Sequence, residues 1–438
     1  MSLVTPLRQL CVCAFFAVLM LSQVTSADAQ TEVTLHTFTN GLDGTNPTGG
    51  LISDGKGNYF GVTGGMPQVF GTVFELSPAT GGGWDLTTLY TFKGGEDGDA
   101  PVGTLVMDKA GNLYGATKTG GNGTYFECFT GTSQSGCGTV FVLSPDRNGG
   151  WKKKTLYQFQ GIGQVKDGFF PSGPLVLDSA GNLYGTTLFG GTGGCAQLGC
   201  GTVFEVSPNA IGRKETILVH FQGGNGGPGG GFPQHGVIFD SAGNLYGVTA
   251  NGGSPNQVCS DGCGTAFKLS PKPGGGWTMM PLYTFPPAYA FPSSPPVLDS
   301  IGNLYGTALG PDFSGLVFKL EPGSASWKAQ ILHNFSGADG THPQQLVMDS
   351  SGTLYGTTMW GGINQPCFGA ILGCGVIFTL SPSSAGAWSE TILYRFSGGS
   401  DGAFPAGPLT IDDMGNLFGV NSGNKTGSGY GTVFEILP

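Results

Sequence analysis

The 438-residue chain contains 82 glycines, 28 prolines and 30 phenylalanines, and only 11% of its residues are charged. Aromatic residues recur at regular places between the glycines, which excludes a disordered low-complexity chain. The formal net charge of −10 repels phosphate backbones and anionic headgroups, so the composition also argues against a nucleic-acid partner.

The first 29 residues have the pattern of a secretory signal peptide. Arg8 precedes the apolar run LCVCAFFAVLML, and the small-residue sequence ADA ends at Ala29. This run is short for a bilayer span, and no later stretch approaches the roughly 20 apolar residues that a membrane helix needs. We therefore expect cleavage near Ala29, secretion to the periplasm or the extracellular space, and one folded domain over residues 30–438 without a membrane span.

Four short phrases, which we name a, b, c and d, recur in this order along the rest of the chain. In the third unit they read FPSGPLVLD (170–178), GNLYGTT (181–187), GTVFEVSP (201–208) and ETILVHF (215–221). They are rich in aromatic and β-branched residues and are separated by Gly, Asp, Asn and Pro, which predicts the strands of a meander. Seven b phrases begin at Gly57, Gly111, Gly181, Gly243, Gly302, Gly352 and Gly415.

The d phrase is missing from the last unit and present before the first. Six d phrases follow their c phrases, the seventh unit stops at its c phrase, and VTLHTF at residues 33–38 stands alone near the start. Seven units of four strands fit a β-propeller, whose radial blades protect their sheet edges. We therefore predict an all-β, seven-bladed β-propeller in which the N-terminal strand pairs with the C-terminal three strands and closes the ring.

The phrases D-x-x-G-N-L-Y-G and G-T-V-F-x-L-S-P resemble the GloVer tandem repeat of Gloeobacter and Verrucomicrobia, over nearly all of residues 31–438. This resemblance implies an exported bacterial protein built of propeller repeats, in a family without an established activity. Members of that family carry varied C-terminal surface anchors, whereas the last phrase here ends at Pro438. The b phrase also resembles propellers of the NHL, gluconolactonase and streptogramin-lyase kinds, some of which hold a divalent metal at the axis and open lactones.

Two sets of repeated aspartates are interpreted as turn residues. One Asp stands three residues before each b-phrase glycine, at Asp54, Asp108, Asp178, Asp240, Asp299, Asp349 and Asp412, where it can cap the a–b hairpin. A second signature, D-G-x-x-P, lies between d and the next a phrase at Asp43, Asp97, Asp167, Asp339 and Asp401. Acids placed one per blade are too scattered to share one ion.

Eight cysteines remain after Cys11 and Cys13 leave with the signal peptide. They form four local pairs, each within one b–c connection: Cys128 with Cys137, Cys195 with Cys200, Cys259 with Cys263, and Cys367 with Cys374. Because an exported protein keeps such pairs oxidised, we predict four disulfides. Thiolate zinc shared between neighbouring loops is the alternative.

We expect the functional site on the face that carries the b–c and d–a connections, because the b–c connections differ in length whereas the a–b hairpins are uniform. Residues that break the repeat there are candidate ligand-binding residues: Tyr125, Phe126, Glu127, Phe129, His235, Asp261, His342, Trp360 and Phe368. The aromatic ones suit stacking on sugar rings. No acid–base carboxylate pair, Ser-His-Asp arrangement or metal motif is identifiable, so we assign no catalytic residue, metal ligand or cofactor.

The favoured hypothesis is an exported, monomeric, non-enzymatic propeller that binds a carbohydrate or protein partner through this disulfide-stapled face. The alternative is a propeller enzyme of the lactonase or lyase type with a metal at the central channel. A further alternative is a structural spacer of the cell envelope.

Overall fold

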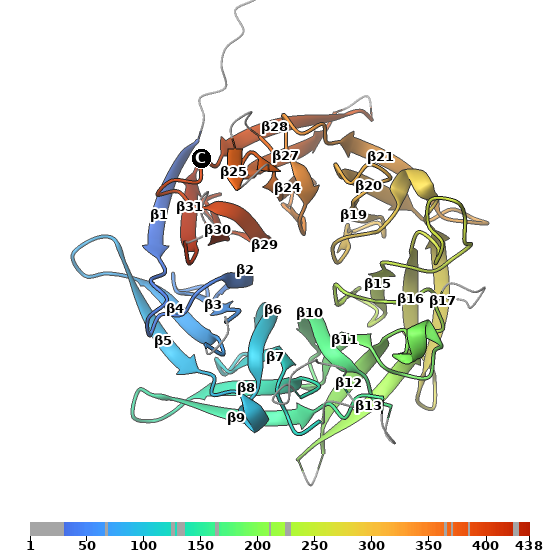
Figure 1. Cartoon of the computed structure of the whole chain (residues 1–438), viewed down its shortest axis with the longest axis horizontal. Helices are drawn as coiled ribbons and strands as arrows, with labels where there is room; N and C mark the ends of the chain where they lie inside the picture. Colours follow the sequence, from blue (N-terminus) through green and yellow to red (C-terminus); the bar gives the residue numbers. More distant parts are fainter. Residues whose placement is uncertain are drawn as a thin grey trace, which may run out of the picture.

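The computed structural model describes residues 30–65, 69–123, 128, 136–162, 166–209, 212–223, 229–362, 366–368, 371–383, 386–423 and 429–438. These residues form the predicted ring of seven antiparallel blades around a central axis (Figure 1). The predicted signal peptide lies outside the described residues. Within the described part of the chain, no helix has the length and apolarity to cross a membrane.

In four blades the inner strand is long. Blade 1 consists of β2 (Pro47–Ser53), β3 (Tyr59–Thr63), β4 (Thr72–Pro78) and β5 (Trp84–Thr91). Blade 2 consists of β6 (Asp99–Met107), β7 (Leu113–Thr119), β8 (Thr139–Pro145) and β9 (Trp151–Gln158). Blade 3 consists of β10 (Phe169–Leu177), β11 (Leu183–Phe189), β12 (Thr202–Asn209) and β13 (Gly212–His220). Blade 7 consists of β29 (Ala403–Ile411), β30 (Leu417–Gly423), β31 (Thr432–Leu437) and the N-terminal β1 (Thr31–Thr37).

In the other three blades the inner strand is short or interrupted. Blade 4 consists of β14 (Val237–Phe239), β15 (Leu245–Thr249), β16 (Thr265–Pro271) and β17 (Trp277–Thr284). Blade 5 consists of β18 (Val297–Leu298), β19 (Leu304–Ala308), β20 (Leu316–Glu321) and β21 (Lys328–Asn334). Blade 6 consists of β22 (Thr341–Pro343) and β23 (Val347–Met348), then β24 (Leu354–Trp360), β27 (Val376–Pro382) and β28 (Trp388–Arg395).

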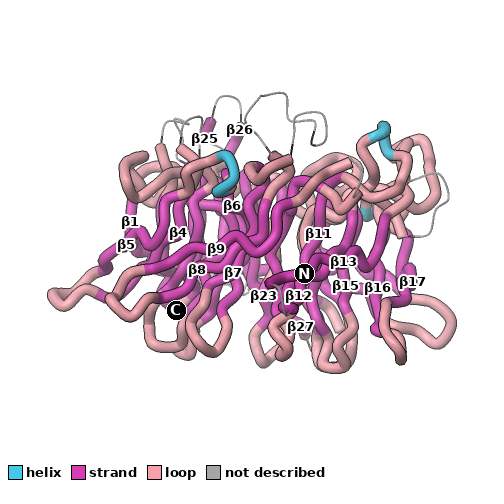
Figure 2. The backbone as a smooth tube through the Cα atoms, turned by 90° about the horizontal axis from the view of Figure 1, so that it is seen from below, coloured by secondary structure: helices cyan, strands magenta, loops and turns pink. Residues whose placement is uncertain are grey.

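The remaining elements are short and belong to the connections. They are the 3-10 turns η1 (Gly95–Asp97), η2 (Cys195–Gln197) and η3 (Pro287–Tyr289), and the hairpin of β25 (Pro366–Phe368) and β26 (Ile371–Leu372). The b–c and d–a connections lie on the same side of the ring, where Figure 2 shows β25, β26 and the 3-10 turns. Backbone hydrogen bonds join the two kinds of connection, as from Gly121 N to Gly95 O over 2.9 Å. We call this side, with the b–c and d–a connections of all blades, the loop face.

The N-terminal strand closes the ring as predicted. β1 pairs antiparallel with β31, from Thr31 opposite Leu437 to Thr37 opposite Thr432. Without β1, the β31 edge would expose unpaired backbone groups. The first and last described strands thus belong to one sheet.

One pair of phenylalanines joins each blade to the next. The last residue of every d phrase packs edge to face on the c-strand phenylalanine of the following blade, with ring centroids 5.0–5.4 Å apart. The pairs are Phe38 with Phe74, Phe92 with Phe141, Phe159 with Phe204, Phe221 with Phe267, Phe285 with Phe318, Phe335 with Phe378, and Phe396 with Phe434. The second glycine of the b phrase makes room for the c-strand ring, since a Cβ at Gly185 would lie 2.6 Å from Phe204 Cζ.

The tryptophans pack between blades, in agreement with the interpretation of the repeat as a structural unit. Trp151, Trp277 and Trp388 contact b-strand aromatic rings of the preceding blade, with centroids 5.8–6.2 Å apart. Trp84 contacts Phe418 of blade 7 in the same way. These contacts add a second aromatic layer to four of the seven blade interfaces.

The aspartates of the a–b hairpins are turn caps, as predicted. Asp178 Oδ1 accepts hydrogen bonds from Ala180 N and Asn182 N, at 2.9 and 2.8 Å. Its Oδ2 accepts from Asn182 Nδ2 at 2.7 Å and from the Tyr184 hydroxyl at 3.1 Å. Four donors therefore occupy this carboxylate, which leaves it little capacity to bind a cation.

The aspartates of the d–a connections cap loops at the outer rim. Asp401 accepts hydrogen bonds from Ser397 N and Gly399 N and from the hydroxyl of Tyr394 in the preceding d strand. At each of these sites the next blade contributes one d-strand residue, which stands three positions before the leucine of the d phrase. We call the five sites rim pockets. Asp97 lies near Lys153, Asp167 near Glu215, Asp339 near Glu390 and Asp401 near Glu32. In the rim pocket of Asp43, Leu86 holds the equivalent position of the repeat.

A truncation of the closing phenylalanine tests ring closure. We expect Phe38→Ala to lower the free energy of unfolding by about 3–5 kcal/mol, because the substitution removes a buried aromatic ring. Phe221→Ala is the matched control, because Phe221 makes the equivalent contact between blades 3 and 4. It should lower the free energy of unfolding by a similar amount. Denaturant titration compares the two variants; a negligible effect of Phe38→Ala beside a large effect of Phe221→Ala would show that β1 does not close the ring.

The Glu215 rim pocket predicts a pH dependence of stability. Burial raises the pKa of Glu215 to about 8, and the Asp167 carboxylate adds to the shift. Asp167 accepts bonds from Gln160 N, Gly161 N and the Tyr157 hydroxyl, so Glu215 is the carboxyl that keeps a proton. The ordinary pKa of 4.5 applies to the unfolded chain, so the folded protein binds more protons between about pH 4.5 and pH 8. Stability contributed by this group therefore falls as the pH rises through this window.

Substitution by glutamine removes this titration. We expect Glu215→Gln to unfold at a higher denaturant concentration than the wild type at pH 8, and the difference to shrink toward zero at pH 4.5, because glutamine mimics the protonated acid. Denaturation midpoints at several pH values measure the difference. A constant difference across the range would mean that Glu215 does not hold its proton in the folded state.

Candidate functional site

In every unit a strained residue stands directly before the proline of the a phrase, at the start of the inner strand or ahead of it. These seven residues have left-handed backbone conformations with φ between 52° and 61°: Asn46, Ala100, Phe170, Phe232, Phe291, His342 and Phe404. Bulky residues seldom adopt this conformation, which costs on the order of 1–3 kcal/mol each. Five of the seven are aromatic, and all five are half-buried.

A hydrogen bond from the preceding blade holds each strained residue. The backbone N–H of Phe232 donates to the carbonyl of Cys200 over 2.7 Å, and that of Phe404 donates to Cys374 over 2.9 Å. The same bond runs from Phe170 to Cys137 and from Phe291 to Cys263. In these four blades the acceptor is the second cysteine of a disulfide, whereas Asn46, Ala100 and His342 bond to Tyr430, Phe70 and Ser314.

The four predicted disulfides are formed on the loop face, with Cα–Cα distances of 5.1–5.2 Å. Each closes a loop of 4–9 residues and fixes the carbonyl that accepts the bond from the next blade. A phenylalanine occupies the strained position after every disulfide-bearing blade, while the other three blades are followed by Asn, Ala and His. The disulfides therefore accompany the positions where a bulky ring is held in a strained conformation.

Aromatic rings gather where the inner strands meet the loop face. Phe189 lies between Phe170 and Phe232, with ring centroids 6.1 and 5.5 Å away. In the next two blades Phe291 stacks on Phe313 at 5.9 Å, and His342 contacts Trp360 at 4.2 Å. Phe313 is 51% exposed. We call these seven residues, Phe170, Phe189, Phe232, Phe291, Phe313, His342 and Trp360, the aromatic arc; it spans blades 3 to 6.

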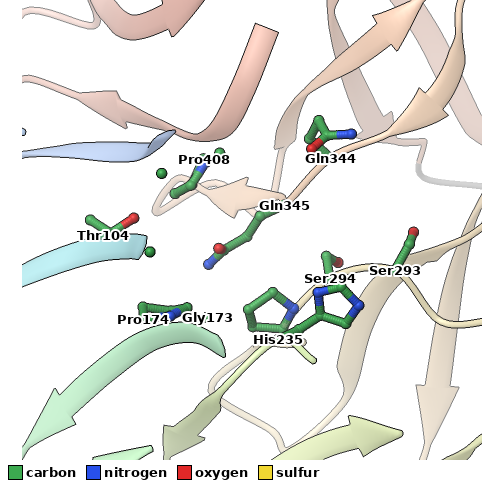
Figure 3. Close-up of a pocket in the computed structure, with 13 residues that line it drawn as sticks. Thr104, Gly173, Pro174, His235, Ser293, Ser294, Gln344, Gln345 and Pro408 are labelled. Atoms are coloured by element: carbon green, nitrogen blue, oxygen red, sulfur yellow. The ribbon is translucent and has the colours of Figure 1, made fainter. Parts of the chain in front are cut away.

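A cavity of about 120 Å³ lies on the axis, lined by residues of all seven inner strands or the segments that replace them (Figure 3). Its wall is different on its two sides. In blades 7, 1, 2 and 3 the second residue after the proline is a glycine, and a Cβ at Gly103 would lie 2.4 Å from the Gly173 carbonyl oxygen. In blades 4, 5 and 6 the same position carries His235, Ser294 and Gln345, which Figure 3 shows on the side opposite Thr104.

The polar lining of the cavity is uncharged. Burial lowers the pKa of His235 to about 4, against a hydrogen bond from the ring to the Pro292 carbonyl, so the imidazole is neutral at neutral pH. The other polar side chains are hydroxyls and amides, namely Thr104, Ser293, Ser294, Gln344 and Gln345. This set can donate and accept hydrogen bonds but offers no net charge to a ligand.

The cavity does not fit the axial metal of lactonase-type propellers. None of the described residues that line it carries a carboxylate, and His235 is the single imidazole among them. Hard divalent cations need 6–8 oxygen ligands, usually with carboxylates, and zinc takes three or four Cys, His or acidic ligands. A larger hollow of about 590 Å³ lies between the a–b turns of blades 2 and 3, but it is lined by the capping residues Asp108 and Asp178 of the repeat.

The structure brings together only some of the predicted site residues. His342 and Trp360 are in contact in blade 6, and His235 lines the axial cavity. Asp261 lies exposed between Cys259 and Cys263, where its carbonyl accepts a bond from Gly252 N. Phe368 belongs to β25, and Tyr125, Phe126, Glu127 and Phe129 lie outside the described residues.

Most of the aromatic arc was not predicted from the sequence, because the candidate site residues were those that break the repeat. Phe170, Phe232 and Phe291 occupy a repeated position, the residue before the a-phrase proline. The residue types at this position could have indicated the arc. A structural turn position does not need a bulky ring, yet five of seven units place an aromatic residue there. The axial set of His235, Ser294 and Gln345 had a similar signal, since it replaces the glycine of the other units.

Comparisons with known proteins identify the repeat family of this chain. A model of the Gloeobacter/Verrucomicrobia repeat matches residues 127–286 and 257–438. A search of curated proteins finds no match. Among solved structures, an X-ray structure of a candidate gluconolactonase is similar at a TM-score of 0.40 and 10% identity, over 93% of this chain and 92% of that one. The family model covers more than half of the chain, and the chain belongs to the Gloeobacter/Verrucomicrobia repeat family.

Proposed function

We propose that the protein is an exported carbohydrate-binding propeller, which holds a neutral glycan on its loop face over the aromatic arc. The single observation that carries the proposal is the ring of strained residues before the a-phrase prolines, five of which are aromatic. Strain of this kind persists only where surrounding bonds enforce it, and it concentrates at functional sites. Here a hydrogen bond from the preceding blade enforces it in each case.

The side chains of the arc suit sugar rings. Half-buried aromatic rings with fixed orientations present flat apolar faces, and Trp360 and Phe189 stand at the ends of b strands beside strained partners. Such faces contact the apolar C–H face of a pyranose, and rigid aromatic residues lose little conformational entropy on binding. The arc spans blades 3 to 6, so it is not the hydrophobic core of one blade. Packing within a single blade therefore does not explain it.

The electrostatics favour a neutral ligand. The formal net charge of −10 repels acidic polysaccharides, and the axial cavity carries hydroxyls, amides and a neutral imidazole. These are the groups that exchange hydrogen bonds with sugar hydroxyls. A volume of about 120 Å³ suits bound water or the edge of one sugar substituent rather than a whole ring, so the glycan would lie across the mouth.

The location of the protein is part of the proposal. Four disulfides favour an oxidising compartment, where a surface glycan is available, and the predicted signal peptide over residues 1–29 would direct export. No observation favours lactone hydrolysis, since the described wall of the axial cavity lacks the acidic ligands that an axial metal would need. A protein partner or a spacer role remains an outcome of the experiment below.

Glycan binding by variants of the arc tests the proposal. We expect an array of neutral glycans to give a signal that Trp360→Ala and Phe232→Ala each reduce about tenfold, which corresponds to about 1.4 kcal/mol of binding free energy. Titration calorimetry with the best glycan gives the affinities. Their melting temperatures should stay close to that of the wild type, because both side chains are partly exposed.

Ile301→Ala provides the matched control, because Ile301 is 78% exposed in an a–b turn on the opposite face. It should leave glycan binding unchanged. Binding that falls equally in all three variants would point to a general loss of structure. Absence of any neutral-glycan signal from the folded protein, or a response to protein partners alone, would refute the carbohydrate proposal.

A further inference from the structure

One rim pocket combines three side chains of the kinds that bind metals. His333 lies in β21 of blade 5, Asp339 in the connection to blade 6, and Glu390 in β28 of blade 6. One ligand atom of each lies within 4.8 Å of the other two, and His333 Nε2 is 3.0 Å from Asp339 Oδ2. All three side chains are half-buried, so an ion could enter from the rim.

From this arrangement we infer a binding site for one divalent transition-metal ion of the zinc type between blades 5 and 6, with His333, Asp339 and Glu390 as ligands. An imidazole nitrogen with two carboxylates suits zinc and its neighbours, whereas calcium and magnesium prefer oxygen ligands throughout. Three protein ligands leave a fourth position for water. In a tetrahedral site with bonds of about 2.0–2.2 Å the ligand atoms lie about 3.3–3.6 Å apart. The atoms of His333 and Asp339, now 3.0 Å apart, would separate slightly, and the Glu390 carboxylate would move closer to them.

An unpartnered carboxylate oxygen supports this assignment. Glu390 Oε1 is buried and has no hydrogen-bond partner. Such an atom is costly to desolvate unless a donor or a cation compensates it. Asp339, in contrast, accepts bonds from Ser336 N and Ser336 Oγ, at 2.7 and 3.0 Å, through its other oxygen. Its Oδ2 therefore remains directed toward His333, and a metal ion would satisfy that oxygen and Glu390 together.

Another rim pocket of the same molecule already contains a cation. Between blades 1 and 2, Lys153 occupies the position of Glu390, and its Nζ lies 3.0 Å from Asp97 Oδ1. The ammonium group is almost fully enclosed, with 4% of the Lys153 side chain exposed. The repeat therefore places a positive charge beside the capping aspartate at this position, and blade 6 replaces that built-in cation with a further carboxylate.

The remaining rim pockets lack one of the three ligands. His36 and Asp43 lie 3.2 Å apart between blades 7 and 1, but Leu86 stands where blade 6 has Glu390. The pockets of Glu215 and Glu32 have tyrosine in place of His333. Among the described residues, the complete set of His, Asp and Glu thus occurs in the pocket between blades 5 and 6.

Zinc binding to the full protein, freed of metal by a chelator, tests the inference. We expect competition with a chromophoric zinc chelator to give one ion per chain, and Glu390→Gln to weaken the affinity at least tenfold. Zinc should raise the melting temperature of the wild type and not that of Glu390→Gln. This variant should fold, because glutamine keeps the shape of the side chain and removes a negative charge beside Asp339.

Two further variants separate this pocket from other histidines and acids. Glu215→Gln, in the equivalent position without a histidine, should bind zinc as the wild type does. Leu86→Glu supplies the missing ligand beside His36 and Asp43, and it should raise the stoichiometry to two ions per chain. The inference is overturned if the metal-free wild type takes up no zinc, or if Glu390→Gln binds zinc as tightly as the wild type.

Discussion

The contact between a d-strand phenylalanine and the c-strand phenylalanine of the next blade is the interaction on which the whole ring depends. It recurs at all seven interfaces, and the rings are fully buried or nearly so. The glycine in the middle of each b strand exists for this contact, since any side chain there would collide with the c-strand ring. The interface at Phe38 belongs to the same series, so the first strand after the predicted signal peptide carries one of the seven contacts that close the circle.

Close packing of the blades also explains the construction of the loop face. Each blade reaches back to the one before it through a backbone bond from its strained residue before the proline. Where that residue is phenylalanine, the accepting carbonyl belongs to a disulfide-bonded cysteine, which cannot easily shift to relieve the strain. The disulfides therefore do more than close short loops. They also fix the carbonyls that accept the backbone bonds of Phe170, Phe232 and Phe291 in the aromatic arc.

Departures from sevenfold symmetry carry the features that could distinguish this propeller from others of its fold. The inner strands of blades 4 to 6 are short, and His235, Ser294 and Gln345 replace the glycines that bring the other inner strands into contact. The rim follows the same logic, because one repeated position carries lysine, glutamate or an apolar residue in different blades. The uniform contacts fix the positions of the backbone, so a change of side chain at one position alters the chemistry without altering the fold.

The sequence by itself determined the blade count, the closure by residues 33–38 and the pairing of the cysteines, because each rests on a local phrase or a short separation along the chain. It also included His235, which lines the axial cavity, and the contacting pair His342 and Trp360 among the candidate site residues. The pattern of phrases could not reveal the aromatic arc, since the direction of Phe232 depends on a positive φ that a carbonyl of another blade imposes. Nor could it reveal the cluster of His333, Asp339 and Glu390, which exists only because two blades pack in a fixed register. Tertiary structure decided these sites, because their atoms come from segments that no local period connects.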